Sequence, residues 1–308
     1  MLPPSGEQFR IEAAGYAAVV TESGAALRSL TCDGRTLVDG FAEDAMAGGG
    51  RGQLLMPWPN RIRDGRYADP SGSGTVHQLA LTEPKRSNAS HGLARWVAWT
   101  PAAHESDRVA LRYRLMAQTG YPWTLDLEVT YVVGPDGLTV TQSATNRAGS
   151  AAPYASGAHP YLLAGTGPVD DWTFTCPAAT RLLTDDARLL PTARADLTGT
   201  DLDFREPRRL GATVVNDAVT DLARDSDGRA TTAVVAADGT GTALWVDQHH
   251  RWLQLYTADD TATPRVSIAV EPMTAPPDAF NSGDDLTLIE PAATFSASWG
   301  IFAIPGSG

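Results

Sequence analysis

The chain has 308 residues, of which 43% are hydrophobic, and its 24 basic and 36 acidic side chains give a formal net charge of −12 at pH 7. This charge repels nucleic acid phosphates and anionic membranes over long range, so we expect the protein to bind neither. No stretch approaches ~18 consecutive apolar residues, and no basic segment followed by an apolar run opens the sequence, so we expect a cytoplasmic protein.

Strands joined by tight turns are predicted along the whole chain. In 124–131 apolar and polar residues alternate with the period of a half-buried strand, and Pro135-Asp136-Gly137 then reverses the chain. The same pattern predicts strands at 17–21, 26–31, 138–144, 233–237, 242–247, 252–257, 265–270, 286–289 and 295–304. Short helices are expected only near 181–190 or 218–223. Many short strands with little helix predict an all-β fold, a large antiparallel β-sandwich, and no linker divides residues 1–308 into more than one domain.

The first segment that differs from strand sequence is 56–62, which contains Trp58, Asn60 and Arg61. Two prolines around Trp58 stiffen the backbone before the planar donors Asn60 and Arg61. A sugar site needs such donors for hydroxyls and an aromatic face for C–H stacking. The alternative is a surface loop with a structural arginine.

Two histidines follow in loops of small residues. His91 precedes Gly92 after a polar stretch, which suits a loop whose backbone approaches a ligand. His159 is fixed between Ala158 and Pro160. Either residue could instead be a satisfied structural histidine.

Two acidic positions are further candidates. Asp217, or Asp221 close behind it, could bind hydroxyls in a bidentate manner, although either could also cap a short helix. Glu271 ends an apolar strand, and a proline-rich loop starts at once. Partial desolvation there would raise the pKa of Glu271 towards the range of a general base.

Other chemistries find little support. His249 and His250 are adjacent on a predicted strand end, so they would point to opposite faces, and we interpret them as a solvated turn rather than a metal site. Cys32 and Cys176 lie far apart and outside any CxxC pattern, which indicates neither a disulfide framework nor a thiolate metal site. The sequence has no GxGxxG, GxxxxGK[ST] or GxSxG pattern.

Taken in order, these segments resemble the aldose 1-epimerase (galactose mutarotase-like) family over nearly the whole chain. The most specific pieces are Asn60-Arg61-Ile62, His91-Gly92, His159-Pro160-Tyr161 and Val270-Glu271-Pro272-Met273. The resemblance implies the family's large antiparallel sandwich and a cofactor-free mutarotase that interconverts the α and β anomers of an aldohexose by opening and closing the ring. By the same resemblance we expect no metal and no cofactor. We also expect the sugar substrate to be the only partner and the protein to be a monomer or homodimer.

The resemblance also implies roles for individual residues. Glu271 would be the general base on the anomeric hydroxyl, and His159 the general acid for the ring oxygen. His91 and Arg61 would orient the substrate and stabilise developing charge, and Asp217 would hold sugar hydroxyls. Asn60 and Trp58 are additional candidates for the wall of the site.

Departures from the family pattern leave the substrate open. Leu93 follows His91-Gly92 where galactose mutarotases have a second glycine, and Leu162-Leu163 follow Tyr161 where they have Phe-Asn. A cluster of basic residues could bind a phosphorylated or sulfonated sugar, or could be a solvated surface; it consists of Arg51, Arg63, Arg66, Lys85 and Arg86. A non-catalytic carbohydrate-binding module is a second alternative, and a glycosidase with Asp278 as partner of Glu271 is a third.

Overall fold

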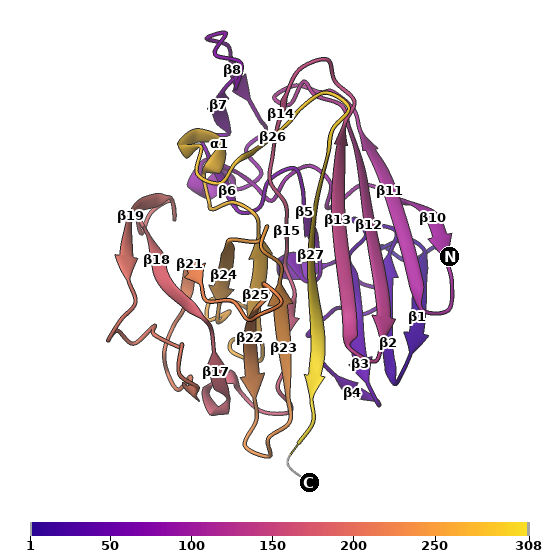
Figure 1. Cartoon of the computed structure of the whole chain (residues 1–308), viewed down its shortest axis with the longest axis vertical. Helices are drawn as coiled ribbons and strands as arrows, with labels where there is room; N and C mark the ends of the chain where they lie inside the picture. Colours follow the sequence, from indigo (N-terminus) through magenta and orange to yellow (C-terminus); the bar gives the residue numbers. More distant parts are fainter. Residues whose placement is uncertain (1, 307–308) are drawn as a thin grey trace.

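The computed structural model describes residues 2–306, and in Figure 1 a small N-terminal sheet lies beside one end of a large sheet that runs across the molecule. A four-stranded antiparallel sheet has the order β1 (Gln8–Ala13), β2 (Tyr16–Thr21), β3 (Leu27–Cys32) and β4 (Arg35–Thr36). A nine-stranded sheet has the order β10 (Thr100–His104), β11 (Arg108–Leu115), β12 (Leu125–Gly134), β13 (Gly137–Asn146), β27 (Thr294–Ile304), β23 (Gly241–Val246), β22 (Ala230–Val235), β17 (Thr173–Thr175) and β20 (Arg208–Arg209).

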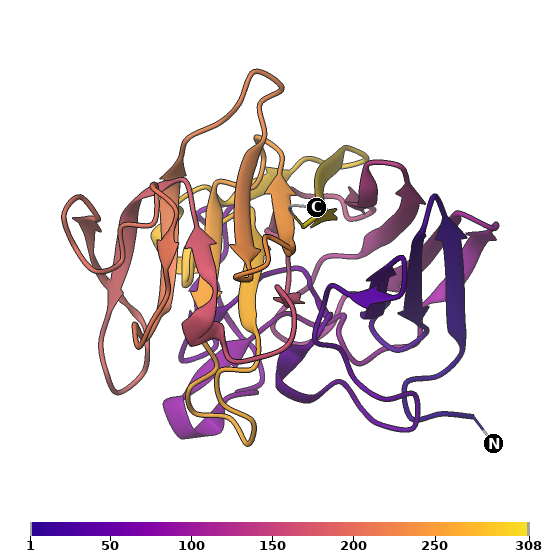
Figure 2. The same ribbon diagram turned by 90° about the horizontal axis from the view of Figure 1, so that it is seen from below.

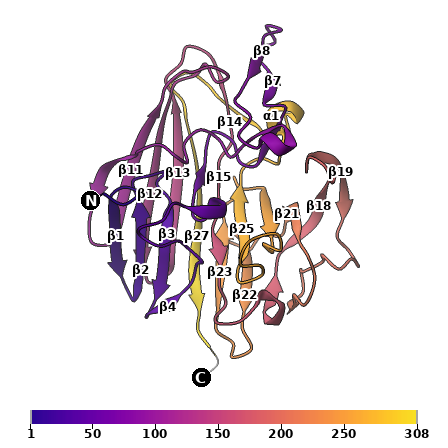
Figure 3. The same ribbon diagram turned by 180° about the vertical axis from the view of Figure 1, so that it is seen from behind.

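A third sheet, of eight strands, lies beside β22 and β23 and is seen from behind in Figure 3. Its order is β19 (Pro191–Asp196), β18 (Ala178–Thr184), β21 (Asn216–Leu222), β24 (Trp252–Tyr256), β25 (Ile268–Met273), β15 (Gly157–Ala158) and β5 (Leu54–Leu55), with β16 (Tyr161–Leu162) also paired to β25. In Figure 2 its outer strands β18 and β19 lie at the opposite end of the molecule from β1–β4.

Short elements complete the fold. Three small pairs are β6 (Arg61–Arg63) with β9 (Asn88–Ser90), β7 (Arg66–Ala68) with β8 (Val76–Gln78), and β14 (Ala152–Tyr154) with β26 (Thr287–Ile289). In the described part of the chain the helical segments are three 3-10 turns, at Gly48–Gly50, Pro84–Arg86 and Val169–Asp171, and α1 (Ala279–Ser282). Within residues 2–306, no helix has the length and apolarity needed to span a membrane.

Strand periodicity explains the core. In β12, Leu127, Val129 and Tyr131 are buried while Glu128 and Thr130 face outward, as the alternation in the sequence predicts. The buried face of β11–β13 packs against β1 and β2, which forms a sandwich. The prediction of an all-β antiparallel sandwich is therefore confirmed.

Some local predictions are wrong. The segments 181–190 and 218–223 are not helical: residues 181–184 belong to β18 and 185–190 form the loop after it, while 218–222 belong to β21, where Val and Thr side chains favour the extended backbone. The pair His249-His250 is not uniformly solvated. His250 is fully buried, and its Nδ1 lies 2.9 Å from Asp247 Oδ1, which is a structural arrangement.

Candidate active site

A polar cavity of about 230 Å³ opens on the eight-stranded sheet. Its lining comes from β6, β16, β21, β24 and β25 and from turns and loops that are far apart in the sequence. The lining residues are Gly49, Asn60, Arg61, Arg86, His91, His159, Tyr161, Leu189, Asn216, Gln254, Tyr256, Asp260, Thr261 and Glu271. Five residues predicted from the sequence are therefore brought together, namely Asn60, Arg61, His91, His159 and Glu271.

Glu271 reaches the cavity because of strand alternation in β25. Ile268 and Val270 point into the core, so Ala269 and Glu271 lie on the opposite face, towards the cavity. The side chain of Glu271 is only 3% exposed. Burial raises the pKa of Glu271 to about 8, against a smaller opposing effect of Arg61.

His159 lies opposite Glu271 across a strand pair. β15 and β16 both pair with β25, Gly157 opposite Met273 and Tyr161 opposite Ala269, and the same register places His159 opposite Glu271. The distance from His159 Nε2 to Glu271 Oε1 is 3.3 Å. Burial lowers the pKa of His159 to about 3. Both members of this Glu271–His159 pair are thus held towards their neutral forms.

His91 forms the next part of the wall. Its backbone has φ of 61°, and its N–H donates to Asn60 O at 2.8 Å. At Gly92, a Cβ would come within 2.1 Å of Met56 O, so only glycine fits behind His91. The imidazole of His91 meets that of His159 edge to face, with centroids 5.7 Å apart. Burial holds the pKa of His91 well below its usual range.

Three amide side chains form a hydrogen-bonded row along the cavity, which we call the amide row: Asn60, Gln254 and Asn216. Asn60 Nδ2 donates to Gln254 Oε1 at 3.2 Å, and Gln254 Nε2 donates to Asn216 Oδ1 at 3.0 Å. Gln254 also lies opposite Glu271 in the pairing of β24 with β25. Because each amide fixes the orientation of the next, the row presents a defined set of donors and acceptors to a ligand.

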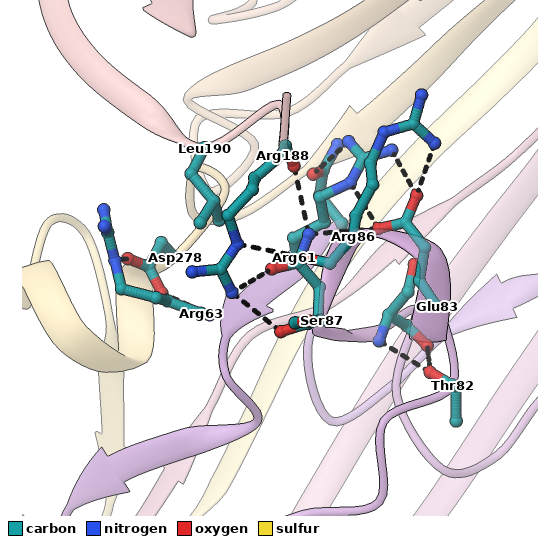
Figure 4. Close-up of polar contacts among 12 residues, drawn as sticks. Arg61, Arg63, Thr82, Glu83, Arg86, Ser87, Arg188, Leu190 and Asp278 are labelled. Carbon is teal, nitrogen blue, oxygen red and sulfur yellow. Dashed lines mark hydrogen bonds and ion pairs between the residues drawn. The ribbon is translucent and has the colours of Figure 1, made fainter. Parts of the chain in front are cut away.

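Arg61 is anchored by a carboxylate behind the cavity. Its Nε and Nη2 donate to the two oxygens of Glu83 at 2.8 and 3.1 Å (Figure 4). Its Nη1 donates to Asn60 Oδ1 at 3.2 Å. Burial raises the pKa of Glu83, but hydrogen bonds and charge from Arg61 outweigh it and keep this pKa below its ordinary value. Glu83 also accepts from Arg86 Nη1 at 3.1 Å, so it partly neutralises both arginines of the cavity.

The loop between β18 and β19, residues 185–190, is fastened to the rim of the cavity (Figure 4). Arg188 donates from Nε to Arg86 O at 2.9 Å and from Nη2 to Ser87 O at 2.8 Å, and its own carbonyl accepts from Asn88 Nδ2 at 3.0 Å. The next residue, Leu189, has φ of 55° and lines the cavity. Arg188 therefore places an apolar side chain against the site.

Two side chains predicted for the site do not line the cavity. Asp217 alternates with Asn216 on β21, so it points to the other face of the sheet, where Arg181 Nη1 lies 3.7 Å from its carboxylate. Trp58 is 2% exposed and packs edge to face on Phe280 at 5.8 Å, within the main hydrophobic core. The alternation places Asn216, not Asp217, in the site, and apolar packing takes Trp58 away from it.

The basic cluster expected from the sequence is not gathered into the site. Of its five members, only Arg86 lines the cavity. Arg51 is paired with Asp39 at 2.9 Å, and Arg63 with Asp278 at 3.4 Å. Asp278 in turn accepts the backbone N–H of Arg63 at 2.9 Å, so this carboxylate fastens a loop and does not lie beside Glu271 in the cavity lining.

Comparison with known proteins identifies the class to which this fold and site belong. The family model for aldose 1-epimerase matches residues 7–301, and the chain belongs to that family. The uncharacterized protein YihR of Escherichia coli K12 is 33% identical over 287 residues, covering 93% of this chain and 90% of that protein. Human galactose mutarotase is 33% identical over 167 residues, which is 52% of this chain and 46% of that protein.

Solved structures share the fold at low identity. A GalM/aldose epimerase homologue from C. elegans superposes with a TM-score of 0.83 at 19% identity, over 97% of this chain and 99% of that one. A galactose mutarotase-like protein from Clostridium acetobutylicum gives a TM-score of 0.84 at 17% identity, over 97% and 95% of the two chains. The galactose mutarotase-like fold inferred from the sequence is therefore confirmed.

Proposed function

We propose that the protein is an aldose 1-epimerase that interconverts the α and β anomers of an aldohexose, with Glu271 as general base and His159 as general acid. The observation that carries the proposal is the 3.3 Å approach of Glu271 Oε1 and His159 Nε2 on the wall of a polar cavity. The anomeric hydroxyl and the ring oxygen are bonded to the same carbon, so the base and the acid that serve them must be close neighbours.

The proton transfers balance within the Glu271–His159 pair. The Glu271 carboxylate takes the proton of the anomeric hydroxyl, the C1–O5 bond breaks, and the His159 imidazolium delivers its proton to O5. The products are an open-chain aldehyde, a carboxylic acid and a neutral imidazole. After rotation about the C1–C2 bond the steps reverse on the other face of the aldehyde, and the pair regains its starting state with no net proton exchanged.

Burial sets which protonation state of the Glu271–His159 pair is the resting one. The neutral acid with the neutral imidazole holds the same number of protons as the carboxylate with the imidazolium, so the two states differ by one proton moved across 3.3 Å. Burial favours the neutral state at both residues. The neutral pair is therefore the resting state, the carboxylate and imidazolium that open the ring form when the proton moves from Glu271 to His159, and ring opening returns the pair to its resting state.

Neighbouring side chains supply orientation. Glu271 Oε2, His91 Nδ1 and His159 Nδ1 are buried and have no hydrogen-bond partner among residues 2–306, which leaves them available to a bound sugar. The amide row and Asp260 offer donors and acceptors to the remaining hydroxyls. Arg61, held by Glu83, lies where it can stabilise negative charge that develops on the substrate.

The size and charge of the cavity favour a single neutral sugar ring. A volume of about 230 Å³ is below the roughly 300–1,000 Å³ of sites for drug-sized ligands, which suits a monosaccharide. Glu83 and Asp260 offset the charges of Arg61 and Arg86, so no uncompensated basic subsite faces the ligand. A binding module would need no buried acid and base within 3.3 Å of each other.

Anomer-exchange NMR over neutral, phosphorylated and sulfonated hexoses tests the proposal directly. We expect exchange between the α and β signals of at least one neutral aldohexose to accelerate in proportion to enzyme concentration. Ligand-induced shifts without accelerated exchange for any sugar would indicate a binding module and refute the proposal. Exchange confined to anionic sugars would keep the reaction but overturn the choice of a neutral substrate.

A further inference from the structure

The general acid proposed above is stacked on a tyrosine. The rings of His159 and Tyr161 are 5.0 Å apart at an interplanar angle of 18°. The two residues are separated by Pro160, and on an extended backbone residues two apart lie on the same side. Tyr161 is fixed in turn, because its hydroxyl donates to Gly49 O at 2.9 Å.

The same tyrosine ring contacts a half-buried cation that is not part of the cavity lining. The guanidinium carbon of Arg51 lies 4.6 Å from the centroid of Tyr161, and the side chain of Arg51 is 15% exposed. Arg51 Nε and Nη2 donate to Asp39 Oδ2 at 3.0 and 2.9 Å, and Ser267 Oγ donates to the same oxygen at 2.8 Å. The guanidinium therefore has a fixed position, not that of a mobile surface charge.

Two further groups, Gly50 and His91, contact the imidazole. At Gly50, which has φ of 77°, a Cβ would lie 2.7 Å from His159 Cδ2, so the backbone presses directly on the ring. The edge of His91 contacts another side at 5.7 Å between centroids. With Tyr161 on its face, the ring of His159 has little freedom to turn.

We propose that Arg51 is a positioning residue that acts through Tyr161 on His159, holding the imidazole in place and making its protonated form a stronger acid. This inference rests on the proposed function, because it assigns Arg51 a part in proton delivery to the ring oxygen. An ether oxygen is a weak base, so it accepts a proton more readily from an imidazolium whose charge is disfavoured by a nearby cation.

Other groups around His159 also influence the pKa of its imidazole. The titratable and charged residues that act on it or contact it are His91, Tyr161, Glu271, Arg51 and Arg95. Burial is the largest cause of the lowered pKa of His159, and Arg51 and Arg95 add to it. Of the two arginines, Arg51 is the one stacked on the tyrosine that contacts the imidazole.

Arg51→Met, which removes the charge but keeps a long side chain, tests the proposal. We expect kcat to fall about 10-fold with KM changed less than about twofold, as for a misplaced catalytic group. The pKa of His159, followed by NMR of its ring signals, should rise towards its ordinary value. Arg51→Lys should restore much of this pKa effect but only part of kcat, because a lysine lacks the fork that binds Asp39.

Two further variants guard against misfolding and against a nonspecific loss of charge. Arg51→Gln provides a second neutral variant if Arg51→Met fails to fold, and Arg66→Met, on the exposed strand β7, controls for loss of one arginine charge. Unchanged kcat and unchanged titration of His159 in Arg51→Met would overturn the proposal. So would a loss of melting temperature and of kcat without any change in that titration, since Arg51 would then be only structural.

The experiment also separates this inference from the proposed function. If the wild-type protein exchanges the anomers of no sugar, the proposed function fails. The titration of His159 still reports whether Arg51 controls the imidazole, because NMR needs no turnover. An upward shift in the Arg51→Met variant would then support the arrangement, and an unshifted titration would overturn it.

Discussion

Replacing Glu271 by Gln should separate catalysis from stability in one variant. Gln keeps the shape of the side chain but neither accepts nor releases a proton at the anomeric oxygen. Because a positioned general base contributes typically ~10²–10⁴-fold, we expect kcat to fall by roughly 10²-fold or more. The cavity keeps its other polar groups, so KM should change much less.

The same change should stabilise the fold at alkaline pH. The pKa of Glu271 rises from 4.5 to about 8 on folding, so the folded state keeps a proton that the unfolded chain releases. The contribution of the protonated Glu271 carboxyl to the free energy of unfolding is fully present below about pH 4.5 and is lost as the pH rises through 8. Gln remains neutral, so Glu271→Gln should have the higher melting temperature at pH 8.5 and a similar one at pH 4.5.

Polarimetry of a freshly dissolved aldose measures the rate, and thermal unfolding at the two pH values measures stability. A gain of ~1 kcal/mol raises the melting temperature of a domain by about 2–4 °C, which is readily resolved. Glu290→Gln, at an exposed position, is the matched control and should change neither quantity. Wild-type activity in Glu271→Gln would refute the role of the base, and equal melting temperatures at pH 8.5 would refute the buried neutral carboxyl.

Three further predictions concern the surroundings of the pair. The active Glu271–His159 pair holds one transferable proton, and the pKa of Glu271 is about 8. The rate of anomer exchange should therefore fall about tenfold per pH unit above pH 8 and recover below it. A flat profile from about pH 4 to 9 would contradict the acid/base pair. Gln254→Leu breaks the amide row and should raise KM about 10-fold in steady-state kinetics, the worth of roughly one polar hydrogen bond, whereas Asp217→Asn on the other face should leave KM within about twofold. Arg188→Ala should release the loop 185–190 and raise KM several-fold, with faster amide hydrogen exchange in that loop; unchanged exchange would show that Arg188 does not fasten it.

Much of the fold could be predicted from the sequence because strand alternation is a local signal. The pattern of 124–131 is enough to assign which side chains of β12 are buried. The sequence singles out Glu271 and His159 as candidates because each stands next to a proline, which is unusual within a strand. Their mutual distance was not predictable, since it depends on the pairing of β15 and β16 with β25.

The differences between the predicted and observed cavity residues arise from which face of each strand is turned towards the cavity. Asp217 is the more obvious sugar ligand by chemistry, but one residue of shift on a strand exchanges the two faces of the sheet, and Asn216 faces the cavity instead. Gln254 was missed because an amide within the strand 252–256 carries no signal without its neighbours. The alternation of that strand places Gln254 and Tyr256 on one face, but only the pairing with β25 shows that this face lines the cavity.

The position of β27 has a consequence for how the chain acquires its structure during synthesis. β27 is the last strand, yet it lies between β13 and β23 and is paired with both, so it joins two groups of four strands into one sheet (Figure 1). The strands of each group can pair while translation continues, but the two groups become one sheet only when residues 294–304 are free to pair between them. Until then, each group exposes an unpaired strand edge, which is the period in which a nascent chain is most open to aggregation.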